Sequence, residues 1–223
     1  MTTKTELLKL VESRFSVTEE SVQFGELEYQ LFRVTDPDVL LDDAAITTTH
    51  EQTDYAPYWA QAWEAAYGLA EFIASMDIHG KSILDLGCGL GITGAVASRL
   101  GGIVTLADYA PPALDFAKLN CHESRERCKF LKLDWRTDDL STKFDIIVGA
   151  DILYDRCDLP FLDAFWRAHL KPTGSLLLSD PTRAMSAEFF AWLRERGWEF
   201  KESTMSIVQS DRPIRIMKTQ LPK

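Results

Sequence analysis

The sequence has few cysteines, and it lacks the patterns that give cysteine a structural role. Cys88, Cys121, Cys128 and Cys157 form no Cys-x-x-Cys pair and share no metal-like spacing with the four histidines. Such spacings mark zinc sites and redox centres, whereas disulfides belong to oxidising compartments. We therefore expect four reduced thiols, no metal site and a cytoplasmic location.

Long apolar runs and a leader are also missing, as is any repeat or low-complexity tract. The N-terminal segment Met1–Glu6 has no apolar core of a signal peptide. No apolar run approaches the ~18 residues that a membrane-crossing helix requires. We expect no association with a membrane.

Positive charge is scarce. The chain of 223 residues has 24 Lys and Arg against 34 Asp and Glu, which gives a formal net charge of −10. Nucleic-acid binding depends on a basic surplus that releases counterions from phosphates, so this balance disfavours a nucleic-acid partner. It permits a cationic partner, such as a lysine-rich protein surface or a positively charged cofactor.

The length fits one α/β domain with a short N-terminal extension, residues 1–56. Leucines at helical spacing predict an amphipathic helix over 5–15, and alternation around Gly25 predicts a β-hairpin over 21–34. An Asp-Pro-Asp sequence then breaks the hairpin. Residues 38–56 are acidic and Thr-rich with no clear period, so an ordered loop or lid is expected there.

A helix is expected to open at Pro57, because proline is well tolerated in a first helical turn. Trp59, Trp63 and Tyr67 recur every four positions and would lie on one face of that helix. Tyr67 is interpreted as core packing against a sheet.

From residue 81 onward, strand and helix patterns alternate with short loops. Strands are predicted over 81–86, 103–108, 128–133, 143–149, 174–179, 198–208 and 213–219, and helices over 92–100, 111–122, 158–170 and 185–196. This alternation predicts a doubly wound, mostly parallel, seven-stranded Rossmann-like sheet with an antiparallel last strand, within a domain of residues 57–223. Ligands of such sheets bind at the carboxyl ends of the strands.

A glycine turn follows the first of these strands. Asp85 precedes Gly87, Gly89 and Gly91, and a dinucleotide-binding turn would instead need a glycine where Ile92 stands. An acid two residues before the first glycine would repel a pyrophosphate. It suits a ligand that carries an ammonium or sulfonium group.

Acidic and aromatic residues follow the second and third strands. Asp108, next to Tyr109, lies 21 positions beyond Gly87, where a carboxylate can accept two hydrogen bonds from a ribose diol. An N-cap of the next helix is the alternative for Asp108. Asp134 and Trp135 end the third strand, where they can bind the edge and the face of an adenine. An ordinary turn acid and a core tryptophan remain the alternative for that pair.

After the fourth strand, the small residues Gly149 and Ala150 let a ligand approach the backbone, and Asp151 and Tyr154 would face the reacting group. The alternative for Asp151 is a cap of the next helix. Taken together, these strand ends describe an adenosine with a charged methionine tail, so the expected cofactor is S-adenosylmethionine, with S-adenosylhomocysteine as product.

The region from about 57 to 219 resembles the class I seven-stranded methyltransferases. Asp151-Ile152-Leu153-Tyr154 resembles the Asp/Glu-x-x-Phe/Tyr motif of their lysine-methyltransferase branch. In that branch a tryptophan before the first strand lies against the cofactor, and Trp63 is the match. The expected cofactor-binding residues are Trp63, Asp85, Gly87, Cys88, Gly89, Asp108, Tyr109, Asp134, Trp135 and Ala150.

A further resemblance is to the lysine methyltransferases of the electron-transfer-flavoprotein β-subunit. They share the Pro-Tyr-Trp-Ala start at Pro57 and an Asp-Pro-Gly-Arg sequence, which here is Asp180-Pro181-Thr182-Arg183. The resemblance implies a protein substrate with an exposed lysine, such as a flavoprotein subunit, and a monomeric enzyme is expected. Trp59, Asp180 and Arg183 are expected at the rim of the substrate site.

The predicted function is methyl transfer to a protein lysine. A lysine with a pKa near 10.4 is ~3.4 units from neutral at pH 7, so deprotonation costs roughly 4–5 kcal/mol. We expect Tyr154, with Trp59, to disfavour the ammonium in an aromatic channel, and Asp151 to orient the amine.

Three other functions remain open from the residues alone. One is a small-molecule N- or O-methyltransferase closed by a lid over residues 36–56. A second is a non-catalytic cofactor-binding module that regulates a partner. The third is a nicotinamide-dependent dehydrogenase, which Asp85 and Ile92 disfavour.

Overall fold

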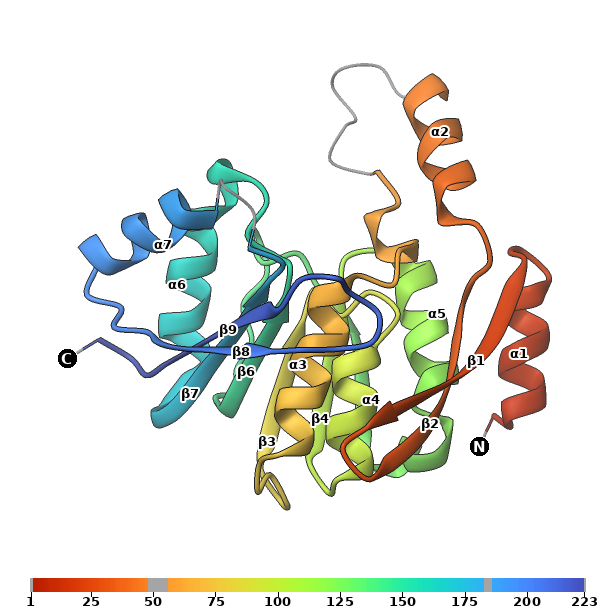
Figure 1. The fold of residues 1–223 in the computed structure, drawn as a ribbon, viewed down its shortest axis with the longest axis horizontal. Helices are drawn as coiled ribbons and strands as arrows, with labels where there is room; N and C mark the ends of the chain where they lie inside the picture. The colour runs from red at the N-terminus through yellow and green to blue at the C-terminus, as the bar shows by residue number, and fades with distance from the viewer. Residues whose placement is uncertain (1, 48–55, 183–185, 223) are drawn as a thin grey trace.

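The computed structural model of the chain describes residues 2–47, 56–182 and 186–222. Its seven central strands are β3 (Ser82–Leu86), β4 (Ile103–Asp108), β5 (Cys128–Lys132), β6 (Phe144–Ala150), β7 (Leu170–Asp180), β8 (Lys201–Met205) and β9 (Ile214–Thr219). They form one sheet in the order β5-β4-β3-β6-β7-β9-β8 (Figure 1). Strands β3 to β7 pair in parallel, while β9 lies antiparallel to both β7 and β8. The predicted doubly wound sheet with an antiparallel last strand is therefore confirmed.

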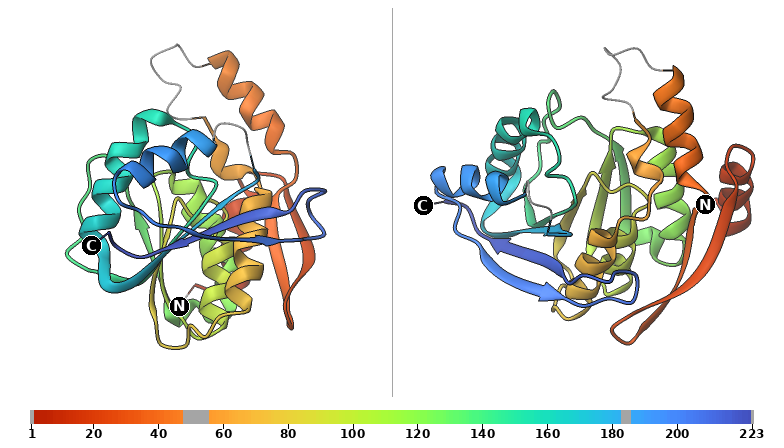
Figure 2. Two further views of the ribbon diagram at one scale, coloured as in Figure 1. Left: turned by 60° about the vertical axis from the view of Figure 1, so that its left-hand side comes forward. Right: turned by 45° about the horizontal axis from the view of Figure 1, so that its top comes forward.

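Helices cover both faces of the sheet (Figures 1 and 2). They are α3 (Glu64–Ala74), α4 (Ile92–Arg99) and α5 (Pro111–Asn120) on one face, and α6 (Leu159–His169) and α7 (Ser186–Glu195) on the other. Successive strand residues point to opposite faces, so Ile83 joins the core beneath α3 to α5 and Leu84 joins the core beneath α6 and α7. No helix in the described ranges combines the length and apolarity that a bilayer crossing needs.

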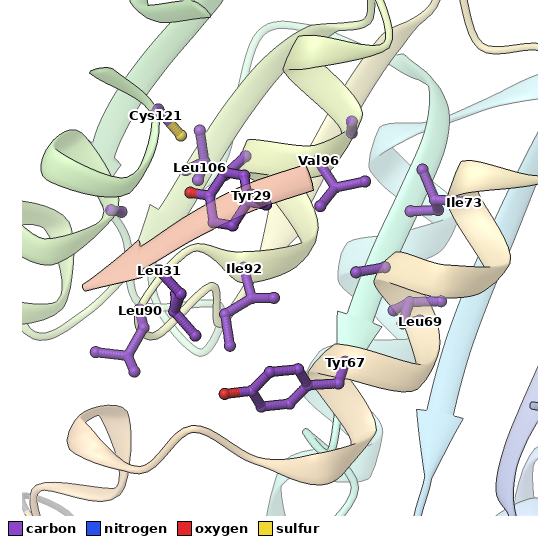
Figure 3. Packing of buried hydrophobic residues seen from close by; sticks show 14 of the residues in the cluster. Tyr29, Leu31, Tyr67, Leu69, Ile73, Leu90, Ile92, Val96, Leu106 and Cys121 are labelled. Carbon is purple, nitrogen blue, oxygen red and sulfur yellow. The ribbon is translucent and has the colours of Figure 1, made fainter. Parts of the chain in front are cut away.

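The N-terminal extension contains the expected helix and hairpin: α1 (Lys4–Glu12), β1 (Val17–Phe24) and β2 (Leu27–Val34). A capping box formed by Thr3 and Glu6 starts α1. Side chains of the hairpin, such as Tyr29 and Leu31, pack against α4 and α5 (Figure 3). The extension and the sheet thus share one hydrophobic core.

Residues 37–47 form a helix, α2 (Pro37–Thr47), where the sequence predicted a loop. That prediction was wrong because Pro37 was interpreted as a breaker. A proline in the first turn and Asp38 beside it are both favourable at a helix N-terminus. The rest of the expected lid, residues 48–55, lies outside the described residues.

The continuous helix expected from Pro57 is also wrong. A short 3₁₀ turn, η2 (Tyr58–Ala60), is followed by extended backbone, and α3 begins only after Trp63. Trp59 and Trp63 therefore do not share a helical face. The Trp63 indole N–H donates to the Tyr58 carbonyl at 2.9 Å, which holds the chain in this bend.

Tyr67 and Gly68 fix α3 against its neighbours. Tyr67 is buried, as expected, and its hydroxyl donates to Glu20 on β1 at 2.9 Å. At Gly68, an added Cβ would lie only 2.6 Å from Ile214 Cβ on β9. The helix can approach the sheet this closely only because residue 68 has no side chain.

Two further short helices in the described residues are η3 (His122–Arg127) and η4 (Arg156–Asp158). The four cysteines are free thiols.

Candidate functional site

The glycine turn connects β3 to α4 in left-handed backbone conformations that favour glycine. Gly91 has φ +78°, and an added Cβ would lie 2.8 Å from Ala117 Cβ on α5. At Gly87, with φ +65°, an added Cβ would lie 3.0 Å from Ile152 and 3.3 Å from the Trp135 ring. The turn is therefore enclosed by α5 on one side and by the ends of other strands on the other.

Two buried acids hold the turn from within. One carboxylate oxygen of Asp85 accepts from the Gly94 N–H at 2.8 Å, and burial raises the pKa of Asp85 to about 7. Asp108 accepts from the Gly89 N–H and from the Ala110 N–H, each at 2.9 Å. Burial raises the pKa of Asp108, and these backbone hydrogen bonds oppose the rise. Asp108 does not cap α5, because Ala110 occupies the N-cap position.

One cleft of about 320 Å³ lies at the carboxyl ends of the strands. Its lining contains most of the predicted site residues and several that were not predicted: Ala56, Tyr58, Trp59, Trp63, Gly87, Gly89, Asp108, Tyr109, Trp135, Arg136, Ala150, Asp151, Ile152, Tyr154 and Asp155. Asp85 and Cys88 instead line a small adjoining cavity of about 30 Å³, together with Trp63, Gly87 and Ala150. The residues predicted after four different strands thus converge on one place.

Trp135 and Asp134 separate at the end of β5. Trp135 lines the cleft, and its buried indole N–H has no hydrogen-bond partner among the described residues. Asp134 is exposed and lies in a neighbouring groove with Tyr109 and Trp59. Its carboxylate accepts from the Arg136 N–H at 2.9 Å, which is the ordinary turn acid of the alternative interpretation. The structure does not bring Asp134 into the main cleft.

Asp151 follows β6 in a strained conformation. Its φ of +57° is uncommon for a residue other than glycine, and its N–H donates to the Ser179 carbonyl on β7 at 3.0 Å. Strain of this kind is concentrated at functional sites, where the surrounding structure enforces it. The Asp151 side chain is nearly buried at the base of the cleft.

Tyr154 lies at the cleft mouth, next to an aromatic residue that sequence reasoning missed. The rings of Tyr154 and Tyr58 are 5.9 Å apart, and those of Tyr58 and Trp63 are 6.5 Å apart. Burial, and then the charge of Asp158, raise the pKa of Tyr154 well above its ordinary value, so the hydroxyl stays protonated at neutral pH. Tyr58 belongs to the Pro-Tyr-Trp-Ala segment and directly precedes the predicted Trp59, which was the available signal.

Arg136 is a second lining residue that was not predicted. Its guanidinium donates to the carboxylate of Asp158, whose side chain is buried at the start of α6. This ion pair connects the loop that contains Trp135 and Arg136 to the junction of η4 and α6. No periodic pattern marks such a contact, since the two residues are 22 positions apart.

Trp59 and the Asp180 segment lie around the site in different ways. Trp59 lines the cleft wall while its ring packs on Phe15 and Phe116, at 5.4 Å and 5.9 Å. Asp180 is buried at the end of β7, where its carboxylate accepts from the Thr182 N–H and the Ser186 hydroxyl. It is not among the residues that line the cleft. Arg183 is outside the described residues.

Comparisons with known proteins agree with this geometry. A model of the lysine methyltransferase family matches residues 42–196. EEF1A lysine methyltransferase 3 of Mus musculus is 33% identical over 132 residues, which are 56% of this chain and 56% of that protein. The electron transfer flavoprotein beta subunit lysine methyltransferase of Xenopus laevis is 31% identical over 137 residues, 57% of this chain and 54% of that protein.

The chain thus spans little more than half the length of these relatives. The names of these two relatives give different protein substrates, although their identities to this chain are nearly equal. The comparisons therefore do not favour the flavoprotein methyltransferases over the other lysine methyltransferases. Among solved structures, the glycopeptide N-methyltransferase MtfA complexed with S-adenosyl-L-homocysteine has a TM-score of 0.61 at 16% identity, covering 71% of this chain and 90% of that chain. This likeness shows the methyltransferase fold.

Proposed function

The chain belongs to the lysine methyltransferase family, and from that premise we propose that it transfers the methyl group of S-adenosylmethionine to a lysine side chain of a protein. One observation carries the proposal. Asp151 and Tyr154, at the end of β6, line the same cleft as the glycine turn and Asp108. A site for an amine and a site for a nucleoside are therefore adjacent.

The residues present fit the cofactor. Asp108 accepts hydrogen bonds from the backbone N–H groups of Gly89, Ala110 and Tyr109. A carboxylate has about four lone-pair sites, so capacity remains for a ribose hydroxyl. The Trp135 ring, which lines the cleft, suits the face of a purine. Asp85, beside the small adjoining cavity, suits the ammonium of the methionine part. When bound, the cofactor supplies an electrophilic methyl group on a sulfonium.

Cys88, Gly87, Gly89, Trp63, Tyr109 and Ala150 complete the proposed cofactor-binding set. Backbone N–H groups and missing Cβ atoms in the turn allow close approach of the ligand. Asp134 is proposed at its outer edge, in the neighbouring groove.

The aromatic side chains at the cleft mouth favour the neutral form of the substrate lysine. The substrate must lose a proton before it can attack, which costs roughly 4–5 kcal/mol at pH 7 for an ordinary lysine. The rings of Tyr154 and Tyr58 offer an apolar mouth that disfavours the ammonium. Asp151 accepts a hydrogen bond from the amine and aims its lone pair, since its negative charge alone would raise the lysine pKa. Positioning is the main contribution that such a displacement needs.

The partner is proposed to be a protein with an exposed lysine on a basic surface, because the chain carries a formal charge of −10. The β subunit of an electron transfer flavoprotein is one candidate, given the Pro-Tyr-Trp-Ala and Asp-Pro sequences. Arg183 and Asp180 are proposed near the substrate rim. Four free thiols fit a reducing compartment such as the cytoplasm.

The deciding experiment incubates the protein with methyl-labelled S-adenosylmethionine and a lysate of its own source. We expect label in a protein band, with methyllysine identified by mass spectrometry after digestion. Label found only in the small-molecule fraction would instead indicate a metabolite methyltransferase and contradict the proposal.

Asp151→Asn provides the matched variant. Asparagine tolerates the left-handed backbone of this position, so the fold should persist. We expect turnover to fall at least ~100-fold while the affinity for S-adenosylmethionine changes less than ~3-fold, because orientation of the amine is lost and the cofactor contacts are not. Calorimetry measures the affinity for S-adenosylmethionine, and the rate of methyl incorporation measures the turnover. Near-normal turnover would refute the role given to Asp151.

A further inference from the structure

Asn120, the last residue of α5, makes three hydrogen bonds with its buried side-chain amide. The carbonyl oxygen accepts from the Phe32 N–H at 2.8 Å. The amino group donates to the Phe32 carbonyl and to the Leu90 carbonyl, both at 2.9 Å. The amide thus pairs with β2 as a neighbouring strand would, and also reaches a third segment.

That third segment is the glycine turn. Leu90 lies between Gly89 and Gly91, and its side chain is buried. Asp108 accepts a hydrogen bond from the Gly89 N–H, and the Asn120 amino group donates one to the carbonyl of the following residue, Leu90. A carbonyl in a turn rich in left-handed glycines has several alternative directions, and this hydrogen bond selects one of them.

The N-terminal hairpin supports the same turn by packing. In Figure 3, Leu31 lies near Leu90 and Ile92, and Tyr29 lies near Leu106 and Cys121 in the same hydrophobic cluster. The Tyr29 hydroxyl donates to the backbone carbonyl of Asn120. The family match begins at residue 42, so this hairpin lies outside the part of the chain that defines the family.

We infer that Asn120 is a positioning residue for cofactor binding, and that through it the N-terminal hairpin fixes the glycine turn in its ligand-binding conformation. The inference rests on the proposed function, because it takes S-adenosylmethionine as the ligand of the turn. Removing the amide would leave the Leu90 carbonyl and both backbone groups of Phe32 buried without these partners. The turn would then shift to find others.

The test measures S-adenosylmethionine binding to the full-length Asn120→Ala variant well below its melting temperature. We expect the Kd, and the KM for the cofactor, to rise at least ~10-fold, with kcat at saturating cofactor within ~2-fold of the unaltered protein. A merely stabilising role would lower the melting temperature and leave this ratio of KM to kcat unchanged.

One variant serves as the control. Ser82→Ala removes hydrogen bonds to Asp145 at the opposite ends of β3 and β6. It should lower the melting temperature with little change in Kd. An unchanged Kd in Asn120→Ala, or an equal rise in Ser82→Ala, would overturn the inference.

Hydrogen exchange in the unaltered protein tests the same coupling without any variant. Adding S-adenosylhomocysteine should slow amide exchange of the peptide that contains Phe32 at least ~3-fold, while the β8–β9 peptide stays unchanged. No slowing at Phe32 would overturn the coupling even if Asn120→Ala failed to fold. Absence of any cofactor binding to the unaltered protein would overturn the proposed function together with this inference.

Discussion

Asp85 is an acid that titrates in the neutral range because it is buried beneath the glycine turn. Its pKa is raised to about 7, chiefly by desolvation, with the nearby charge of Asp108 adding to the rise. Below that pH the side chain is largely neutral, and above it the side chain is an anion. A buried anion attracts the ammonium of the cofactor far more strongly than a neutral carboxyl does.

We therefore expect the affinity for S-adenosylmethionine to increase as the pH rises from 6 to 8, by up to about tenfold per unit below the pKa of Asp85. Calorimetry across this range measures it. Asp85→Asn keeps the oxygen that accepts from Gly94 and should flatten the profile. If the affinity depends on pH in the same way in both proteins, titration of Asp85 does not control cofactor binding. Any titration of the cofactor itself affects both proteins equally.

Besides Asp151, Thr182 is the non-glycine residue in the described ranges with a left-handed backbone, at φ +61°. It stands where the Asp-Pro-Gly-Arg sequence that this segment resembles has glycine, and a β-branched residue is costly in this conformation. Its N–H still donates to Asp180 at 2.7 Å, so the turn itself is well formed. The threonine therefore adds strain to a turn whose geometry suits glycine.

Thr182→Gly should stabilise the protein by about 0.5–1 kcal/mol. Relief of a left-handed L-residue gives roughly 1–2 kcal/mol, and the extra freedom of an unfolded glycine offsets part of it. Urea unfolding measures the change. Thr204→Gly, on the exposed strand β8, is the matched control and should destabilise by up to about 1 kcal/mol. A destabilised Thr182→Gly would mean that the threonine side chain contributes more than its strain costs.

The sequence predicted site residues where the strand ends could be located. Asp108 and Asp151 each follow a clearly apolar strand, so their convergence came from the parallel sheet alone. Tyr58 and Arg136 were missed because their roles depend on ring and ion-pair contacts with distant segments. Asp134 lies outside the main cleft, in two adjoining pockets, one of which it shares with Trp135 and Tyr154. Its role at the adenine edge stays a prediction.

At the scale of elements, α3 shows how closely a helix can be fitted to a strand. Gly68 faces Ile214 of β9, with an added Cβ 2.6 to 2.8 Å from three of its atoms. Alanine ordinarily favours a helix over glycine by about 1 kcal/mol. Here overlap with Ile214 opposes that preference.

We expect Gly68→Ala to destabilise the protein by about 1–3 kcal/mol, because overpacking forces the helix away from the sheet. Chemical denaturation measures the loss. In the double variant with Ile214→Ala, two of the close contacts disappear, so the total cost should be less than the sum of the single costs. Stabilisation by Gly68→Ala would show that helix propensity dominates at this contact.

The central parallel strands β3 and β6 were well predicted because each is a short, mostly apolar and buried run. The continuous helix predicted from Pro57 was wrong because the hydrogen bond from the Trp63 indole to the Tyr58 carbonyl bends the chain there. The loop predicted over 38–47 was wrong because Pro37 starts a helix, which no periodic pattern indicated. Helical periodicity of three aromatics was not enough to specify a helix.

At the scale of the whole molecule, the net charge of −10 acts on any charged partner before contact is made. A basic protein substrate is attracted over distances of about the Debye length, which is ~10 Å at 0.1 M salt and ~3 Å at 1 M. The attraction assists docking and plays no part in the transfer step.

The KM for the protein substrate should therefore rise several-fold between about 50 mM and 500 mM salt, while kcat stays within about 2-fold. Initial-rate kinetics at saturating S-adenosylmethionine measure both. The KM for the cofactor is the internal control and should change little by comparison. A substrate KM that does not depend on salt would indicate docking through apolar contacts.

The position of β9 between β7 and β8 constrains the order in which the chain can fold during synthesis. β8 is synthesised first, yet among the strands that the structure describes it pairs with β9 alone, which is synthesised afterwards. Until residues 214–219 emerge, β7 presents an unpaired edge and β8 has nowhere to pair. Such an edge is a template for intermolecular association. A chain in which β9 has not yet paired therefore exposes the β7 edge to pairing with other molecules.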